Sequence, residues 1–355
     1  MRRGLISRSK TELPDAALDA RLERLRAAMT DAQLDAVLIY TNNTRPAGVS
    51  WLTGFVPYWS EALLVVPRMS PPALVVALTY RVKSWIERTS RVAEVIHTPR
   101  TGLEAGRMIA ASKSDAAVGV VDLDGLPAGI ADDLAEGGPR LSLSDASAIF
   151  ARLRAKADPT EVALAMQAAW IARRALAQAR QQGASLGPII AAVEAMSRQL
   201  GAEEVYIAAA PDLDRDRRLS RVEGEMVVGR SFALRASVAY KGSWIRLLRT
   251  FLREDAQDAL YEEAAARLAQ AVAGLPSERA FTGFSSWLVE GCRLCQPLDP
   301  LMGSRLAEAN PPVPGALVSV QANMEVDGQP ILLGAPALVG GRGEAASLLI
   351  DPVFD

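Results

Sequence analysis

Nitrogen and sulfur ligands for metal ions are scarce in this chain. Its 355 residues include one histidine, His97, and two cysteines. Zn²⁺ and Co²⁺ sites are usually built with imidazole or thiolate, so this chain has too few of these side chains to bind two such ions side by side. His97 ends the apolar run 92–97, which is typical of the end of a strand rather than of a metal site. The sequence therefore predicts no metal, and we expect no other cofactor.

The two cysteines form one Cys-x-x-Cys pair, Cys292 and Cys295. A single pair cannot complete a zinc site, and no histidine lies nearby in the sequence. Arg293 stands between them and could favour a reactive thiolate for redox or nucleophilic chemistry. The alternative is two ordinary buried or loop cysteines, which the sequence favours because no thioredoxin-like strand and helix surround the pair.

Long apolar runs and an excess of one charge are also missing. The longest apolar stretches, such as 62–67 and 73–78, have the length of a strand and not of a membrane span. The formal net charge is −2 and the basic residues are scattered, which argues against nucleic acid or a membrane as a partner. No apolar segment follows the basic N-terminus as in a secretory signal, so we expect a soluble, cytoplasmic protein.

The chain does contain enough apolar residues for two hydrophobic cores, since they make up 50% of the sequence. Helical and strand patterns alternate in the first part, which predicts a mixed α/β domain over residues 1–150. Two amphipathic helices and then a strand-rich segment predict an α+β domain over 151–355. The expected helices are 15–31, 159–180, 186–200 and 255–273, and the expected strands of the first domain are 36–40, 63–66, 74–78 and 118–121.

The segment 231–251 predicts a β-hairpin with two arginines in its arms. Apolar and β-forming residues flank the turn residues Lys241-Gly242-Ser243 on both sides. Arg235 and Arg246 lie at similar distances from this turn, so their side chains are expected within reach of one another if the register places both on one face.

This hairpin resembles the metal-site hairpin of the pita-bread superfamily, which includes creatinase, aminopeptidase P, prolidase and methionine aminopeptidase. The family pattern is roughly D-x-G-A-x-Y-x-G-Y-x-S-D-I-T-R-T-F, and its landmarks here are Tyr240, Gly242 and the Arg-Thr-Phe triplet 249–251. Alignment on these landmarks puts Arg235 and Arg246 where the peptidases have metal-binding aspartates. Both anionic ligands are cations in this chain.

The resemblance extends over nearly the whole chain. Residues 153–162 resemble the entry to the first catalytic-domain helix, 314–321 resemble a P-G-M-V-x-S-V-E strand, and 51–55 resemble the Y-L-T-G-F segment of the creatinase-type N-terminal domain. The resemblance implies a creatinase-like α/β N-terminal domain followed by an α+β pita-bread domain. It places the degenerate metal-ligand positions at Arg235, Arg246, Phe284, Gln321 and Gly334.

These substitutions predict a metal-independent, non-peptidase member of the superfamily, a pseudoenzyme or a regulatory or structural subunit. Guanidinium pairs suit carboxylate, phosphate or sulfate, so we predict a small anionic ligand bound by Arg235, Arg246, Gln321 and Tyr240. The alternative for the arginines is pairing with internal acids. The candidate acids are Glu223, Glu225, Glu290 and Glu325.

A different function is also open: a repurposed, metal-free hydrolase or lyase that acts on C–N bonds of a small carboxylated amide or amidine, as creatinase does. Its general base would have to be Glu290, Glu325 or Cys292. For partners, the resemblance implies a homodimer, or a heteromer with an active paralogue. In the latter case the loop 42–59 would complete the partner's pocket.

Overall fold

The computed structural model describes residues 9–45, 47–57, 59–181, 183–222, 226–253, 258–292, 304–306, 312–341 and 343–352. The chain divides into two compact units, Met1–Arg154 and Ala155–Asp355. The boundary expected at 150/151 falls inside the helix α6, Ser147–Ala155, just before this division.

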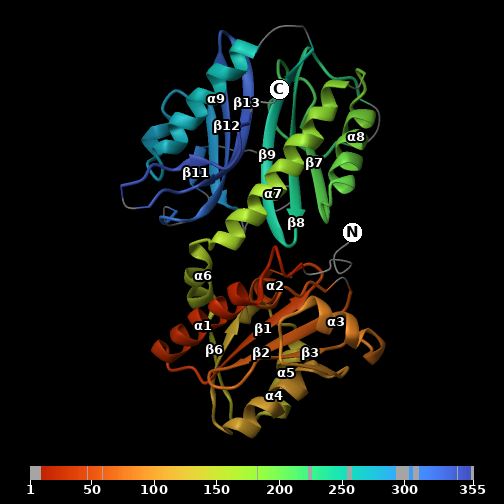
Figure 1. Ribbon diagram of the computed structural model, residues 1–355, viewed down its shortest axis with the longest axis vertical. Coiled ribbons are helices and arrows are strands. Elements are labelled where there is room, and N and C mark those ends of the chain that lie inside the picture. Colours follow the sequence, from red (N-terminus) through yellow and green to blue (C-terminus); the bar gives the residue numbers. More distant parts are fainter. Residues whose placement is uncertain are drawn as a thin grey trace. The chain divides into compact units, whose positions relative to one another are not determined.

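The first unit is a layered α/β domain built on a mixed six-stranded sheet of order β4-β3-β2-β1-β5-β6 (Figure 1). Strand residues alternate between two cores, as the pleat requires. On β1, Val37 and Ile39 face a core with helices α1, α2, α3 and α6, whereas Ala36 and Leu38 face a core with α4 and α5. The strands are β1 Ala36–Asn42, β2 Glu61–Pro67, β3 Ala73–Val76, β4 Glu94–His97, β5 Ala117–Val121 and β6 Ser142–Asp145. The helices are α1 Asp15–Asp31, α2 Ala47–Thr53, α3 Lys83–Thr89, α4 Thr101–Ser112, α5 Ala128–Gly137 and α6, with the 3₁₀ turns Tyr80–Val82 and Leu123–Gly125.

The second unit begins with a helix whose start is fixed by its own sequence. The Asp158 side chain accepts a hydrogen bond from the Glu161 backbone N–H at 2.9 Å, and Glu161 accepts one from the Asp158 N–H at 3.1 Å. This capping box, with Pro159 at the first helical position, satisfies N–H groups that the helix cannot pair itself. The expected helix 159–180 is observed as α7, Pro159–Leu176, followed by a 3₁₀ turn, Ala177–Gln181.

The rest of the second unit is an eight-stranded sheet of order β11-β10-β12-β13-β9-β8-β7, with β14 beside β13. One face packs against α7 and α8 on one half and α9 on the other, forming two apolar cores (Figure 1). Its strands are β7 Glu204–Ala210, β8 Ser231–Tyr240, β9 Ser243–Leu252, β10 Ser286–Gly291, β11 Ser304–Leu306, β12 Leu317–Val326, β13 Gln329–Leu338 and β14 Ser347–Leu348. Its other helices are α8 Leu186–Gln199 and α9 Asp258–Ala273, with a 3₁₀ turn at Glu278–Phe281.

The opposite face of this sheet is more polar. A small apolar cluster that includes Leu213, Leu219, Leu248 and Leu288 covers part of it. Arg235 and Arg246 of the hairpin lie on this face, because residues of β8 and β9 alternate between the two sides. This face therefore carries the candidate site.

None of the described helices is both long and apolar enough to cross a membrane.

Candidate functional site

The β8–β9 hairpin places Arg235 and Arg246 on the same face of the sheet. Arg235 is paired with Leu248 across the strands, and Arg246 is paired with Ser237. Directly opposed residues share a face, so the two arginines are diagonal neighbours. The turn consists of Lys241 and Gly242, both with positive φ, of 46° and 78°. Such a two-residue turn suits the twist of a hairpin and fixes the register.

Arg235 contacts Gln321 across two intervening strands. The register runs from Arg235 through Leu248 and Gly334 to Gln321, on β8, β9, β13 and β12. Nη1 of Arg235 donates to Oε1 of Gln321 at 3.2 Å. Gly334 carries no side chain between them, and its missing Cβ would lie 2.5 Å from the Val320 carbonyl oxygen. This row joins three of the five degenerate ligand positions.

Arg246 forms an ion pair with Glu290 of β10. Glu290 is paired with Ser319, and Ser319 with Pro336, so the side chains between the two charged groups are short. The side chains of Arg246 and Glu290 are 0% and 7% exposed. Buried charges need such pairing, because an uncompensated ion in the protein interior costs several kcal/mol.

Gln321 links the two arginines through Glu290. Its amide Nε2 donates to Oε1 of Glu290 at 3.4 Å, while its amide oxygen accepts from Arg235. The amide oxygen of Gln321 thus faces the cation, and its amide NH₂ group faces the anion. Both ends of the side chain therefore bond with the polarity that their partners require. We call these four residues, Arg246, Glu290, Gln321 and Arg235, the arginine network.

The network contains one of the four acids considered as internal partners. Glu325 instead pairs with Arg217, at 2.9 Å between Oε1 and Nη2, and its side chain is exposed. Glu223 and Glu225 lie outside the described residues. Glu290 is thus the carboxylate that the fold brings to Arg246.

Two serines beside the network were not identified from the sequence. Ser237 is opposite Arg246, Ser319 is opposite Glu290, and both are 0% exposed. Neither hydroxyl has a hydrogen-bond partner among the described residues. Ser237 lies two residues from Arg235, and Ser319 lies two residues from Gln321. Residues two apart in a strand share a face, so this spacing in the sequence could have identified both serines.

Tyr240 and Phe284 are not brought to the network. Tyr240 falls on the other face of β8, packs against the core of α7 and α8, and has the Lys241 ammonium 5.4 Å from its ring centroid. Phe284 precedes β10 and packs on the α9 side, with its ring centroid 5.5 Å from that of Phe281. The prediction that Tyr240 shares an anion site with Arg235 therefore needs correction, because the two residues differ by an odd number of positions in one strand.

Arg249 lies on the helix side of the sheet, opposite to Arg235 and Arg246. Its guanidinium carbon is 4.9 Å from the Tyr261 ring centroid, and Nη1 donates to the Pro352 carbonyl at 3.4 Å. Burial, with a smaller contribution from Arg180 and other neighbours, lowers the pKa of Arg249 to about 10. Arg249 therefore acts in packing and not in the candidate site.

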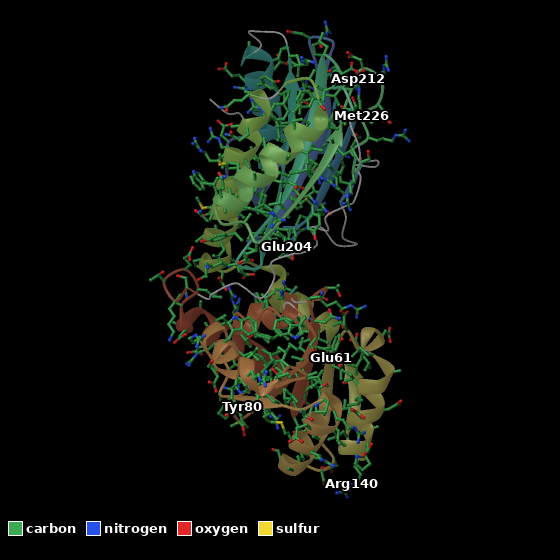
Figure 2. The ribbon with its side chains drawn as sticks, turned by 90° about the vertical axis from the view of Figure 1, so that its right-hand side faces the viewer. Glu61, Tyr80, Arg140, Glu204, Asp212 and Met226 are labelled. Carbon is green, nitrogen blue, oxygen red and sulfur yellow. The ribbon has the colours of Figure 1, made fainter. Side chains whose placement is uncertain are left out.

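The remaining predicted residues are dispersed. His97 ends β4, and its Nδ1 lies 2.9 Å from the Leu78 carbonyl oxygen. Cys292 is buried and Cys295 lies outside the described residues. Nη1 of Arg45 donates to the Gly125 carbonyl at 2.8 Å. Glu204, which was not predicted as a site residue, is labelled in Figure 2 at the start of β7 and accepts from the Tyr206 hydroxyl at 2.8 Å.

The donor set does not fit a divalent metal ion. The network offers one carboxylate, one amide and two guanidinium groups, and the guanidinium groups repel a cation. Within the described part of the chain, no group of three or more His, Cys, Asp or Glu side chains could hold a metal ion. The residues suit hydrogen bonding to an oxyanion instead.

Comparisons with known proteins identify the class. The family model of the creatinase/prolidase N-terminal domain matches residues 21–156. No curated protein matches the sequence. The Xaa-Pro dipeptidase from Bacillus anthracis superposes with a TM-score of 0.69 at 16% identity, covering 94% of this chain and 97% of that one. The prolidase from Pyrococcus horikoshii gives 0.67 at 14% identity, covering 93% and 97%. The dipeptidase PepE from Mycobacterium ulcerans gives 0.65 at 18% identity, covering 94% and 96%.

These likenesses confirm the predicted fold class. Residues 21–156 match the creatinase/prolidase N-terminal domain, and the whole chain has the two-domain fold of the prolidases and dipeptidases with which it superposes. Within that class, the hairpin of this chain carries Arg235 and Arg246 where the resemblance expects carboxylates.

Proposed function

We propose that this chain is a metal-independent, non-peptidase member of its superfamily that binds a small anion at the arginine network. The observation that carries the proposal is the buried chain of contacts Arg246–Glu290–Gln321–Arg235. It occupies the sheet face and the strand positions at which the resemblance expects a dinuclear metal centre. A site that holds guanidinium groups in this geometry recognises oxyanions and not metal cations.

The buried serines support an anion rather than a network complete in itself. The hydroxyls of Ser237 and Ser319 are enclosed and, within the described residues, have no hydrogen-bond partner. A buried hydroxyl without a partner costs about 1–3 kcal/mol. An oxyanion beside the Arg246 guanidinium would accept from the nearer of these hydroxyls and remove its share of that cost.

A pseudoenzyme role as a regulatory or structural subunit follows from the same chemistry. The similar solved proteins are named as dipeptidases and prolidases, and a chain with this network lacks the ligands for metal-assisted hydrolysis. We propose that the protein acts as a homodimer or beside an active paralogue. Native mass spectrometry of the protein from its own host distinguishes these assemblies and identifies any retained anion.

The alternative, a metal-free hydrolase or lyase, needs a general base. Of the candidates, Glu290 is paired with Arg246, Glu325 is paired with Arg217, and Cys292 is buried. A carboxylate that accepts from an arginine must give up that contact before it can take a proton from a substrate. The contacts of these residues therefore favour the binding role over catalysis.

Calorimetric titration with sulfate and phosphate, together with an assay on Xaa-Pro dipeptides in the presence of Mn²⁺ or Co²⁺, tests the proposal. We expect saturable anion binding that Arg235→Met weakens, with Ser237→Ala giving a smaller loss, and no peptide turnover. Arg217→Met, which removes a partly exposed arginine of the same unit, is the matched control. Peptide turnover that disappears in Arg235→Met, or anion binding that is equal in Arg235→Met and Arg217→Met, would refute it.

A further inference from the structure

A separate pocket of about 570 Å³ lies within the first unit, between the sheet and α4. It opens where β1 and β3 begin and β2 ends, and its lining includes Ala36, Val65 and Ala73 from these strands and Met108 and Ile109 from α4. Its volume is in the range of sites that bind small molecules, about 300–1,000 Å³. All of its lining residues belong to the first unit, whereas the arginine network belongs to the second.

The pocket exists because short side chains meet at this edge of the sheet. Ala36 is paired with Pro67, and Val65 is paired with Ala73 on the neighbouring strands. Alanine and proline leave space below the longer Met108 side chain of α4. The floor is therefore apolar, which is the usual character of a small-molecule site.

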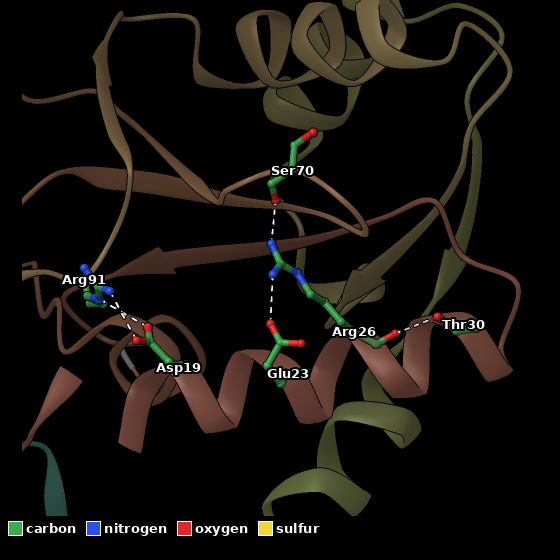
Figure 3. Close-up of polar contacts among 6 residues, drawn as sticks. All are labelled: Asp19, Glu23, Arg26, Thr30, Ser70 and Arg91. Carbon is green, nitrogen blue, oxygen red and sulfur yellow. Dashed lines mark hydrogen bonds and ion pairs between the residues drawn. The ribbon is translucent and has the colours of Figure 1, made fainter. Parts of the chain in front are cut away.

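The walls are held in place by hydrogen bonds that do not depend on a ligand. Arg26 of α1 donates from Nη2 to the Ser70 carbonyl at 2.6 Å, and from Nη1 to Glu23 at 2.9 Å (Figure 3). The Ala93 N–H donates to the Pro72 carbonyl at 3.1 Å. Ser70, Pro72 and Ala93 all line the pocket, so its wall is pre-organised.

One end of the pocket is polar and carries cations. Asp35 accepts from Lys113 Nζ at 2.7 Å and from the Ala117 N–H at 3.0 Å through Oδ2, and from Arg68 Nη2 at 3.2 Å through Oδ1. Both carboxylate oxygens are thus engaged. The Lys113 side chain remains 52% exposed, and an ammonium group has three donors, so it can still donate to a bound group.

The other acidic lining residue, Glu94, lies far from this end. Glu94 begins β4, and the sheet order places β3 and β2 between β4 and β1. At about 4.8 Å per strand, the two ends of the pocket are roughly 14 Å apart. An anionic group would therefore be favoured near Lys113 and disfavoured near Glu94.

We propose that this pocket binds a small amphipathic anion, with an apolar chain or ring on the alanine and proline floor and a carboxylate-type head at Lys113. The carboxylate head accepts hydrogen bonds from the Lys113 ammonium, which also donates to Asp35. The apolar body covers apolar pocket surface that is otherwise open to solvent. This site is independent of the arginine network and of its proposed function.

The test uses the full chain with ¹³C-labelled methionine methyl groups and follows Met108 by NMR. The probes are octanoate, octan-1-ol and octylammonium, which share a chain and differ in head group. We expect octanoate to shift the Met108 signal saturably and to bind roughly tenfold more tightly than the other two. Met69 and Met166, which are exposed and lie outside the lining, are internal controls and should not move.

Two substitutions locate the binding. Ser112 is an exposed lining residue at the end of α4, so Ser112→Trp should block the pocket without disturbing the core, whereas Ser114→Trp places the same side chain on an exposed residue outside the lining. Lys113→Met should weaken octanoate roughly tenfold and leave octan-1-ol unchanged. The proposal is overturned if Met108 does not respond, if the three head groups bind equally, or if Ser112→Trp binds octanoate as well as Ser114→Trp does.

Discussion

Arg246 and Glu290 form a buried ion pair although their strands, β9 and β10, are separated by β13 and β12. The long arginine side chain reaches across the sheet face because Pro336 and Ser319 stand in the same row. A pair of this kind connects the two halves of the sheet, each of which packs on different helices. Its energetics can be tested directly.

Removing one partner of this pair should be costly, and removing both should be less so. Arg246→Met leaves a buried carboxylate, and Glu290→Met leaves a buried guanidinium, so we expect each to lower the free energy of unfolding by about 3–5 kcal/mol. The double variant Arg246→Met/Glu290→Met should cost less than the sum of the two single changes. Urea unfolding followed by circular dichroism measures all of these values.

The control for this cycle is Arg217→Met. Arg217 and Glu325 form a more exposed pair, with side chains 34% and 56% exposed, so its loss should cost less than about 1 kcal/mol. Strictly additive effects at positions 246 and 290 would show that the two side chains are not coupled.

Gly334 should not tolerate any side chain. A Cβ there would lie 2.5 Å from the Val320 carbonyl oxygen and 3.0 Å from the Gln321 Cα, which are backbone atoms that cannot turn aside. We expect Gly334→Ala to cost about 3 kcal/mol through overpacking. Gly187→Ala in α8 is the matched control, because nothing lies within 4 Å of its Cβ position. A helical alanine should stabilise the protein there by about 0.5–1 kcal/mol. Equal melting temperatures for the two variants would contradict this account.

Asp35 should make the stability of the first unit depend on acid pH. Its hydrogen bond with Lys113, together with the Ala117 N–H, holds the pKa of Asp35 below its ordinary value of 3.8. Because the pKa is lower in the folded state, the stabilisation is complete above 3.8 and is lost as the pH falls through the folded-state pKa. Asp35→Asn should therefore destabilise the protein by about 1 kcal/mol near neutral pH, and by progressively less as the pH falls below 3.8.

Chemical unfolding at a series of pH values, with Asp132→Asn as an exposed control in α5, measures this difference. A gap between wild type and Asp35→Asn that stays constant, or widens, as the pH falls would disprove the linkage.

In the β8–β9 turn, we expect a substitution at position 241 to stabilise the protein and one at position 242 to destabilise it. Lys241 adopts φ 46°, a left-handed conformation that asparagine tolerates better than lysine, so Lys241→Asn should raise stability by about 0.5 kcal/mol. Gly242→Ala places a Cβ at φ 78° and should cost about 1 kcal/mol. Thermal unfolding of both variants tests the turn type, and a stabilising Gly242→Ala would be inconsistent with it.

The sequence predicted local elements well because their periodicity is local. The expected helix 15–31 is observed as α1 with the same bounds, and the hairpin 231–251 is observed as β8 and β9. The shared face of Arg235 and Arg246 follows from the register that a two-residue turn imposes. Short elements such as β6, whose residues are all exposed, lack an apolar pattern and were not predicted.

The partners of the arginines could not be chosen from sequence in the same way. Glu290 was one of four acids considered, and only the strand order that brings β10 and β12 toward β9 selects it. Tyr240 was grouped with Arg235 because it is near in sequence, although the alternation of a strand puts the two on opposite faces. The pocket beside Lys113 is built from stretches of the chain that are far apart in sequence, within 35–36, 65–73, 93–94 and 108–116, so no local sequence pattern indicates it.

The close approach of the Val320 carbonyl to Gly334 also limits how an arginine network could change into a site lined by carboxylates. Carboxylates could be introduced at positions 235, 246 and 321 by side-chain replacement alone. A glutamate at 334 would first require β12 and β13 to move apart, because the backbone fills the space its Cβ needs. If position 334 is a former ligand position, as we propose, restoring a glutamate there takes a backbone shift as well as a single substitution.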